Sequence, residues 1–190
     1  MDQTSLCPEP DMAALLELVV QDEPQGLVRL SGLLARWPSD PRLHFLEGSL
    51  KASNQDYASG ARSMRRALDI APEFVLARFQ LGFLQLTSGE PFAAQESWGP
   101  LHGLPNNHFL RHFVEGLCHL IRDEFEKAQF ELETGIAANT EVEPLNRDMM
   151  LIVEEIRTRA ASIPGAVGQD EPVSATQMLL RQASLKATRH

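Results

Sequence analysis

The stretch LEGSLKASNQDYASGARSMRRALDIAP (46–72) decides how this chain folds. Gly48 lies among helix-forming residues, a polar break follows at 53–56, and Gly60 lies in a second helix-forming run that ends before Pro72. Small residues at such points let two helix backbones approach closely, and a polar break between two helical runs is typical of a short turn. The stretch therefore predicts a helical hairpin.

The same pattern recurs at a constant interval, because Gly48, Gly82 and Gly116 are equally spaced along the chain. A phenylalanine precedes each glycine by three positions, and a small residue follows it by twelve: Phe45, Phe79 and Phe113; Gly60, Ala94 and Ala128. Projected back by one period, the pattern reaches Ala14 and Gly26, which indicates a weaker fourth unit. Because one hairpin alone leaves an apolar face uncovered, such units are expected to stack.

This 34-residue period resembles the tetratricopeptide repeat. The matching positions are Gly48, Tyr57, Gly60, Ala67 and Pro72 in one unit; Leu81, Gly82, Gly89 and Ala94 in the next; and Gly116, Phe125 and Ala128 in the third. The resemblance covers residues 7–162 and implies an all-α, right-handed α-solenoid of about four helical hairpins. It also implies a bacterial protein that holds another polypeptide.

We expect the helical array to occupy residues 1–162. Its units are predicted at about 7–40, 41–74, 75–108 and 109–142, with turns at 53–56, 88–91 and 122–124 and a capping helix at 144–162. The capping helix has apolar residues on one face and charged residues on the other, as the end of a stacked array requires. Residues 163–172 are interpreted as a linker. Residues 173–190 are interpreted as a basic amphipathic tail helix, in which Ser174 and Gln177 form a capping-box pattern.

Charge is unevenly distributed along the chain. The net charge is −9, of which residues 1–172 contribute −12 (14 basic, 26 acidic) and residues 173–190 contribute +3. An acidic body disfavours nucleic-acid binding. The absence of an apolar run of about 20 residues and of a signal-peptide pattern predicts a cytoplasmic protein without membrane insertion. Two cysteines, Cys7 and Cys118, do not make a disulfide framework.

One polar stripe is a candidate for chemistry. His108, His112, Glu115 and His119 are spaced to share one side of a helix, and histidines one turn apart can bind a divalent metal. The equivalent positions one period earlier do not keep a set of ligands, which favours a hydrogen-bonded structural stripe instead. No phosphate-binding loop, serine-nucleophile motif or paired-cysteine motif is present, so we expect neither an enzyme nor a metal or other cofactor.

The resemblance further implies that the first helix of each hairpin lines a concave surface. The predicted partner-binding residues there are Phe45, Ser49, Phe79, Phe83, Leu86, Phe113, Leu117 and Leu120. A groove with so many apolar residues would suit an amphipathic helix or an extended apolar segment, either from a partner or from the chain's own tail. Alternatively, this stripe is ordinary core, because these helices also pack against their neighbours.

The predicted function is therefore that of a scaffold, adaptor or chaperone that binds a partner segment in the groove. Two alternatives remain open. One is a chaperone similar to the class II chaperones of bacterial type III secretion, which hold apolar translocator segments. The other is a structural module that self-assembles into homo-oligomers through the exposed apolar ends of its array.

Overall fold

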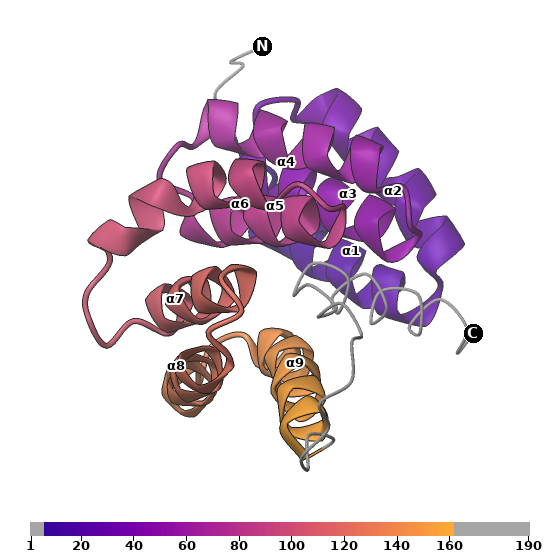
Figure 1. Ribbon diagram of the computed structural model, residues 1–190. Coiled ribbons are helices and arrows are strands. Elements are labelled where there is room, and N and C mark those ends of the chain that lie inside the picture. Colours follow the sequence, from indigo (N-terminus) through magenta and orange to yellow (C-terminus); the bar gives the residue numbers. More distant parts are fainter. Residues whose placement is uncertain (1–5, 162–190) are drawn as a thin grey trace. The chain divides into compact units, whose positions relative to one another are not determined.

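The computed structural model describes residues 6–161, and every regular element in that range is helical (Figure 1). The α-helices are α1 (Glu9–Gln21), α2 (Glu23–Arg36), α3 (Pro41–Ser53), α4 (Tyr57–Ile70), α5 (Val75–Thr87), α6 (Pro91–Trp98), α7 (Phe109–Ile121), α8 (Phe125–Ala138) and α9 (Glu143–Ala161). A 3₁₀ helix, η1 (Gly99–Gly103), follows α6. The predicted all-α class is confirmed.

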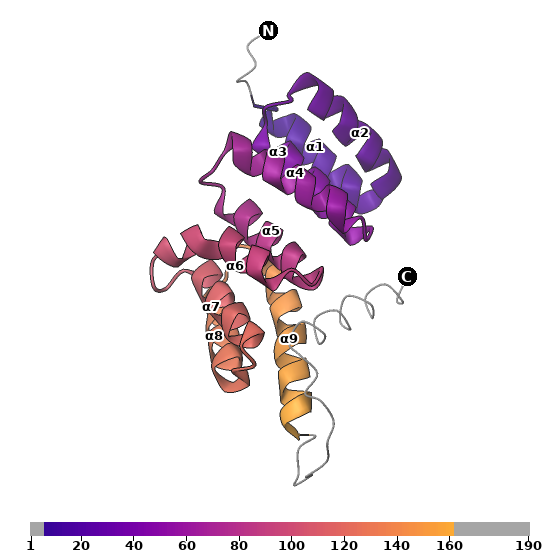
Figure 2. The same cartoon turned by 45° about the horizontal axis from the view of Figure 1, so that its top comes forward.

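Packing divides the chain into two compact units, Met1–Leu81 and Gly82–His190, with the boundary inside α5. In the first unit α1 pairs with α2, α3 pairs with α4, and α2 also contacts α3 (Figure 2). The core shared by α1, α2 and α3 is made of Met12, Leu15, Leu30, Leu33, Trp37, Leu43 and Leu50. Burial of these side chains holds the two hairpins together.

Three glycines lie where a side chain of the paired helix packs directly against the helix backbone. A Cβ atom added to any of them would lie less than 3 Å from a side chain sixteen positions further along the chain. The pairs are Gly48–Met64, Gly82–Trp98 and Gly116–Leu132. The register between the two helices is therefore the same in all three hairpins.

The turns inside these hairpins repeat as well. Gln55 (φ 65°), Gly89 (φ 84°) and Asp123 (φ 56°) adopt the left-handed conformation, and they are spaced by the same period as the three glycines. In each turn the N–H of the next residue donates to the carbonyl five positions back, which closes the preceding helix. These bonds run from Asp56 to Lys51 (2.9 Å), from Glu90 to Gln85 (2.9 Å) and from Glu124 to His119 (3.0 Å). The three turns lie where the sequence predicts them.

The first hairpin follows a different register. Only Asp22 separates α1 from α2, whereas three residues separate the helices of the other hairpins. The close approach in this hairpin is between Gly26 and Val19, since a Cβ on Gly26 would lie 2.7 Å from Val19 Cγ2. Ala14 lies one period before Gly48 and was expected to make the equivalent close contact, but it is exposed. The projection to Ala14 is therefore wrong, because the shorter connection shifts one helix along the other.

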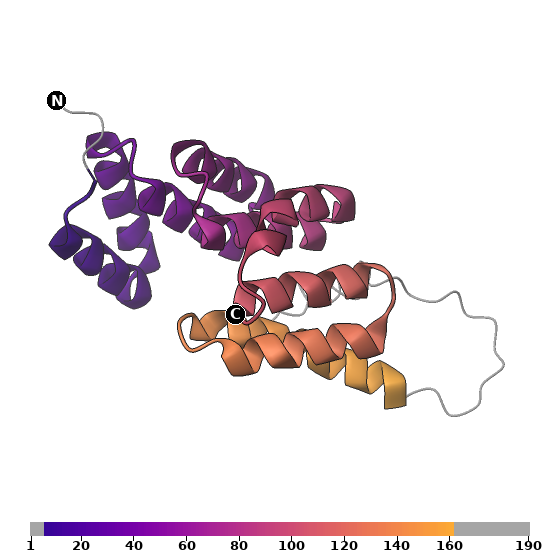
Figure 3. The same ribbon diagram turned by 90° about the vertical axis from the view of Figure 1, so that its left-hand side faces the viewer.

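In the second unit α7 and α8 lie side by side and α9 packs along α8 (Figure 3). Helix α9 lies where the sequence predicts a capping helix, and it buries Leu145, Met149, Ile152, Val153 and Ile156. The predicted linker and tail, residues 163–190, lie outside the described residues. Within residues 6–161, no helix is both long and apolar enough to cross a membrane.

Candidate interaction surfaces

The predicted groove residues divide into an enclosed set and a partly exposed set. Five of the eight have no exposed surface: Phe79, Leu86, Phe113, Leu117 and Leu120. Phe45, Ser49 and Phe83 are half-buried. Helix α7 explains much of this result, because eight of its thirteen residues are buried. The enclosed five match the alternative interpretation of this stripe as core, and they offer a partner no contact surface.

The partly exposed residues on α3 form a short uncharged stripe. Phe45, Ser49 and Ala52 are spaced to share one side of this helix, and all three are half-buried. The ring of Phe45 packs against Phe74, with a centroid distance of 5.2 Å. Ser49 Oγ donates to the carbonyl of Phe45 at 3.0 Å, so its hydroxyl is satisfied within the helix.

Polar side chains pair between the first and second helix of each regular hairpin. Ser63 Oγ donates to Glu47 Oε2 (2.8 Å), Ser97 Oγ donates to Gln85 Oε1 (2.7 Å), and His112 Nδ1 lies 2.7 Å from Glu131 Oε2. The second-helix members, Ser63, Ser97 and Glu131, are also one period apart from each other. These pairs give the polar side chains that face each other inside each hairpin a partner within the chain.

The histidines of the candidate metal stripe are held by separate partners. His112 pairs with Glu131, His119 pairs with Glu124, and His108 instead caps α7 by accepting from the N–H of Leu110 at 3.1 Å. Glu115 pairs with a histidine outside the stripe, His102, at 2.9 Å. Among the described residues, no group of three or more histidine, cysteine or acidic side chains is arranged to hold a metal ion. The stripe is hydrogen-bonded, as its structural interpretation expects.

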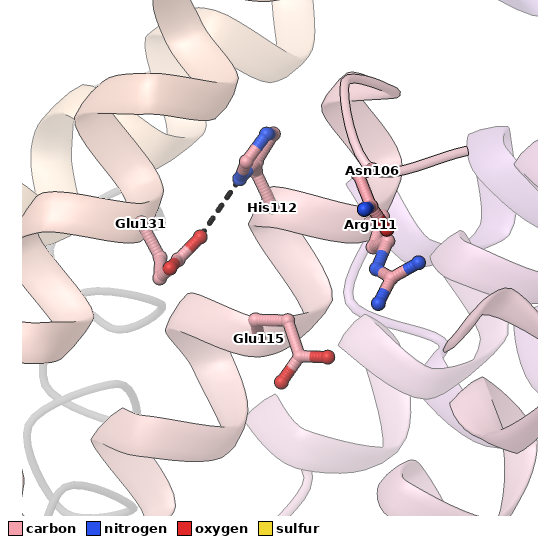
Figure 4. Close-up of a pocket in the computed structure, with 5 residues that line it drawn as sticks. All are labelled: Asn106, Arg111, His112, Glu115 and Glu131. Carbon is pink, nitrogen blue, oxygen red and sulfur yellow. Dashed lines mark hydrogen bonds and ion pairs between the residues drawn. The ribbon is translucent and has the colours of Figure 1, made fainter. Parts of the chain in front are cut away.

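An open hollow of about 310 Å³ lies beside this stripe and is lined by Asn106, Arg111, His112, Glu115 and Glu131 (Figure 4). Figure 4 shows His112 turned toward Glu131, while Arg111 is turned away from that pair. Arg111 donates to the carbonyl of Leu104 at 2.8 Å, and Glu115 is engaged with His102. These side chains therefore tie the segment before α7 to α7 and α8.

The two cysteines lack the features of a nucleophile. Cys7 and Cys118 are both buried. Burial raises the pKa of the Cys118 thiol to about 11, and the nearby Glu115 adds to this effect. Burial, followed by the charges of nearby acids, also raises the pKa of Cys7. Both thiols therefore remain protonated at neutral pH, and the protonated form is unreactive.

Large apolar side chains are exposed on several helices, among them Val28 on α2, Phe92 on α6 and Phe130 on α8, and helix α1 carries two of them on one side. Ala13, Leu16 and Val20 are spaced to share one side of the helix, and the last two are 47% and 87% exposed. We call Ala13, Leu16, Glu17 and Val20 the α1 face. The sequence indicates this face by two pairs of consecutive apolar residues, 15–16 and 19–20. In each pair the first residue packs against the core and the second is exposed.

The surroundings of the α1 face are acidic. Residues 6–28 contain no lysine or arginine, and they contain five acids: Glu9, Asp11, Glu17, Asp22 and Glu23. Glu17 accepts from Gln21, Asp22 from Gln25 and Glu23 from Asn54, so these three carboxylates are bound by amides rather than by cations. The negative charge beside Leu16 and Val20 is therefore not neutralised by an ion pair within the face.

A buried polar latch fixes the start of α1. Asp40, which is fully buried, accepts from the N–H of Cys7 at 2.8 Å and from Arg42 Nη2 at 2.9 Å. Arg42 also donates to the carbonyl of Cys7 (2.7 Å) and pairs with Glu9. Burial alone would raise the pKa of Asp40, but the hydrogen bonds from Arg42 and Cys7 outweigh it and lower that pKa. The latch ties α1, and with it the α1 face, to the beginning of α3.

Among the described residues, the surfaces thus differ in what they can do. The polar stripe and its hollow are occupied by pairs within the chain, whereas the α1 face combines the exposed Leu16 and Val20 with Glu17, whose carboxylate is bound by an amide rather than by a cation. The sequence matches no family model and no curated protein.

Proposed function

We propose that this chain is a protein-binding module built from tetratricopeptide-like hairpins stacked in a right-handed solenoid, and that it acts as a scaffold, adaptor or chaperone. Two repeated features support this proposal. The first is the common register of the glycine contacts, and the second is the left-handed turn residue that recurs once in every period. Repeated hairpins of this kind use their extended surfaces to bind other polypeptides.

The main evidence for the position of the binding site is the exposure of Leu16 and Val20 on an acidic helix. The partner of matching chemistry is an amphipathic helix whose apolar stripe is flanked by lysine or arginine. Burying an aliphatic side chain of this size contributes about 1.5–3 kcal/mol, which the ordering of the partner partly offsets. We therefore expect specific but moderate affinity, with an association rate that falls as salt is added.

The α1 face replaces the α7 part of the predicted groove as the proposed contact surface, because the groove residues on α7 have no exposed area. Phe45 and Ser49 on α3 remain part of the proposal, since α3 shares a core with α1 and both residues are only half-buried. Glu17 on the α1 face and the acids beside it, Asp22 and Glu23, also disfavour self-assembly through this surface, because two copies would bring like charges together. Holding an apolar segment of a secreted protein, as class II chaperones do, is a narrower form of the same function.

The test uses two fluorescent peptides that each form an amphipathic helix of about five turns. One carries leucine and lysine, and the other carries leucine and glutamate. We expect the full chain to bind the leucine–lysine peptide and not the leucine–glutamate peptide in anisotropy titrations. Val20→Glu should weaken binding by about tenfold or more, since roughly 1.4 kcal/mol corresponds to a factor of ten. Phe92→Glu is the matched control, because Phe92 is 86% exposed on α6.

Two results would overturn the proposed site. Absence of binding by both peptides would remove the function, and equal loss of binding in Val20→Glu and Phe92→Glu would remove the assignment to α1. Size-exclusion chromatography with light scattering in the same buffer measures the oligomeric state. A stable dimer that Val20→Glu dissociates would identify self-assembly as the use of this face.

A further inference from the structure

We propose that helix α4 carries a second binding site, an arginine patch that takes an acidic segment of a partner polypeptide. The patch consists of Arg62, Arg65 and Arg66, which lie three and four positions apart and therefore share one side of the helix. All three are exposed, and no other stretch of five residues in the chain contains three lysines or arginines. This site is separate from the α1 face and has the opposite charge.

The other side of α4 keeps the patch at the surface. Gly60, Met64 and Ala67 are buried on that side, and α4 pairs with α3 within the first compact unit (Figure 2). Because α3 covers the apolar side of the helix, the arginine side is left to the solvent. The helix rises about 6 Å from residue 62 to residue 66, so the three positive charges lie along little more than one turn.

Acids of the chain do not neutralise the patch. Within residues 6–161, none of its three arginines forms an ion pair, and Arg62 donates to a neutral hydroxyl, Ser59 Oγ, at 2.7 Å. Arg29, by contrast, pairs with Asp11 at 3.2 Å. Like charges one turn apart weaken a helix. The patch therefore lowers the stability of α4, and no ion pair in the described part of the chain offsets this effect.

The positive region is short. The acids of α4 lie toward its ends: Asp56 caps the first turn by accepting from the N–H of Ser59 at 3.1 Å, and Asp69 is exposed in the last turn. Residues 57–68, which lie between these acids, contain the three arginines and no acid. The patch is thus a local positive surface on a chain whose residues 1–172 carry −12.

These dimensions suit carboxylates on a short extended peptide. One guanidinium group can donate two parallel hydrogen bonds to one carboxylate. In an extended peptide, side chains two positions apart lie on the same side and about 6.5–7 Å from each other, which matches the length of the patch. A segment with acids at alternate positions therefore has the spacing that the patch requires.

A nucleic acid fits the patch less well. Its phosphates continue beyond the patch, where the −12 charge of residues 1–172 repels them. Single strands also bind by stacking their bases on aromatic side chains. The one aromatic residue of α4, Tyr57, is half-buried and lies outside the patch.

The first test is an anisotropy titration of the full chain with a fluorescent peptide of about eight residues in which serine and glutamate alternate. We expect this peptide to bind, and the matching serine–glutamine peptide not to bind. The variant Arg62→Gln, Arg65→Gln, Arg66→Gln should weaken binding about tenfold, because exposed ion pairs are individually weak but three are lost together. Glutamine preserves the helix, since its helix propensity is close to that of arginine.

A matched variant changes the net charge by the same amount and leaves the patch intact. It is Arg36→Gln, Arg147→Gln, Arg157→Gln, in which the three arginines are exposed on α2 and α9. Its affinity for the serine–glutamate peptide should remain within about threefold of the wild type, because distant exposed charges are screened by salt. Equal affinities of the two variants would overturn the assignment to α4, and absence of binding by the wild type would overturn the site.

Two further titrations separate this site from other uses of the chain. A fluorescent oligothymidylate of about 20 nucleotides should bind more weakly than the serine–glutamate peptide. Tighter binding of the oligothymidylate, abolished in the patch variant, would overturn the polypeptide partner. The leucine–lysine peptide should bind the patch variant at least as tightly as the wild type, because its proposed site is the α1 face. Absence of leucine–lysine binding in every chain would overturn the proposed function and leave the arginine patch to be judged by the serine–glutamate peptide.

Side-chain NMR locates the contact in the unmodified protein. With nitrogen-15 in the arginine side chains, the Nε–Hε resonances of Arg62, Arg65 and Arg66 should shift when the serine–glutamate peptide is added. Those of Arg36 and Arg147 should stay in place. Shifts confined to arginines outside the patch would overturn the inference.

Discussion

Replacing Gly48 and Gly32 by alanine should change stability in opposite directions, although both glycines lie inside helices of the first unit. A Cβ atom on Gly48 would lie 2.7 Å from Met64 Cγ and 3.0 Å from the backbone oxygen of Gly60. Met64 is 1% exposed and has little room to move. A Cβ atom on Gly32 would meet nothing within 4 Å.

The magnitudes follow from two opposing effects. Alanine favours a helix over glycine by about 0.5–1 kcal/mol. Overpacking of a close contact costs about 1–3 kcal/mol. We therefore expect Gly48→Ala to lower the free energy of unfolding by about 1 kcal/mol and Gly32→Ala to raise it by about 0.5–1 kcal/mol.

The assay is urea denaturation followed by circular dichroism, with the same protein concentration and buffer for the wild type and both variants. The sign of each change is the decisive result. A Gly48→Ala protein as stable as Gly32→Ala would refute the close approach of α3 and α4 at Gly48. The same result would remove the physical reason for the regular spacing of the glycines.

Three further predictions concern the buried and titrating groups. Asp40→Ala should lower the free energy of unfolding by about 2–3 kcal/mol in urea denaturation, because it leaves the polar groups of the latch without their acceptor; no change would contradict the latch. The pKa of Glu124, which is lowered to about 2 chiefly by the hydrogen bond from His119, should return toward its ordinary value in His119→Ala when carboxyl carbon shifts are titrated by NMR. Because the folded-state pKa is the lower one, the stabilisation from Glu124 is complete above the ordinary glutamate pKa and is lost as the pH falls toward 2; an unchanged pKa in the variant would refute this cause. Neither Cys7 nor Cys118 should react with iodoacetamide in the native protein at about pH 8, whereas both should react in urea, as mass spectrometry will show; rapid native labelling would contradict their burial.

The repeating hairpins could be predicted from the sequence because close helix packing requires small residues. Glycine meets that requirement at positions 48, 82 and 116, and the equal spacing of these glycines makes the repeat visible in the sequence. The left-handed turn position could not be predicted in the same way, since Gln55 and Asp123 are not glycine. Their conformation is imposed by closure of the preceding helix rather than by residue type.

The candidate site was less predictable, because the sequence of an apolar stripe does not show whether a neighbouring helix covers it. Leu117 and Leu120 have the spacing of a groove, but they lie on the apolar side of α7, which is enclosed. Whether such residues are buried depends on how the helices pack together, which the spacing within one helix does not show. The exposed Leu16 and Val20 could have been suspected from the doublets on α1, because a helix at the surface can bury only one side.

Methyl NMR on the full chain tests the central claim most directly. With leucine and valine methyl groups labelled, we expect that adding the leucine–lysine peptide shifts the resonances of Leu16 and Val20. The resonances of the enclosed Leu117 and Leu120 should remain in place. Shifts confined to Leu117 and Leu120, with Leu16 and Val20 unchanged, would contradict the assignment of binding to the α1 face.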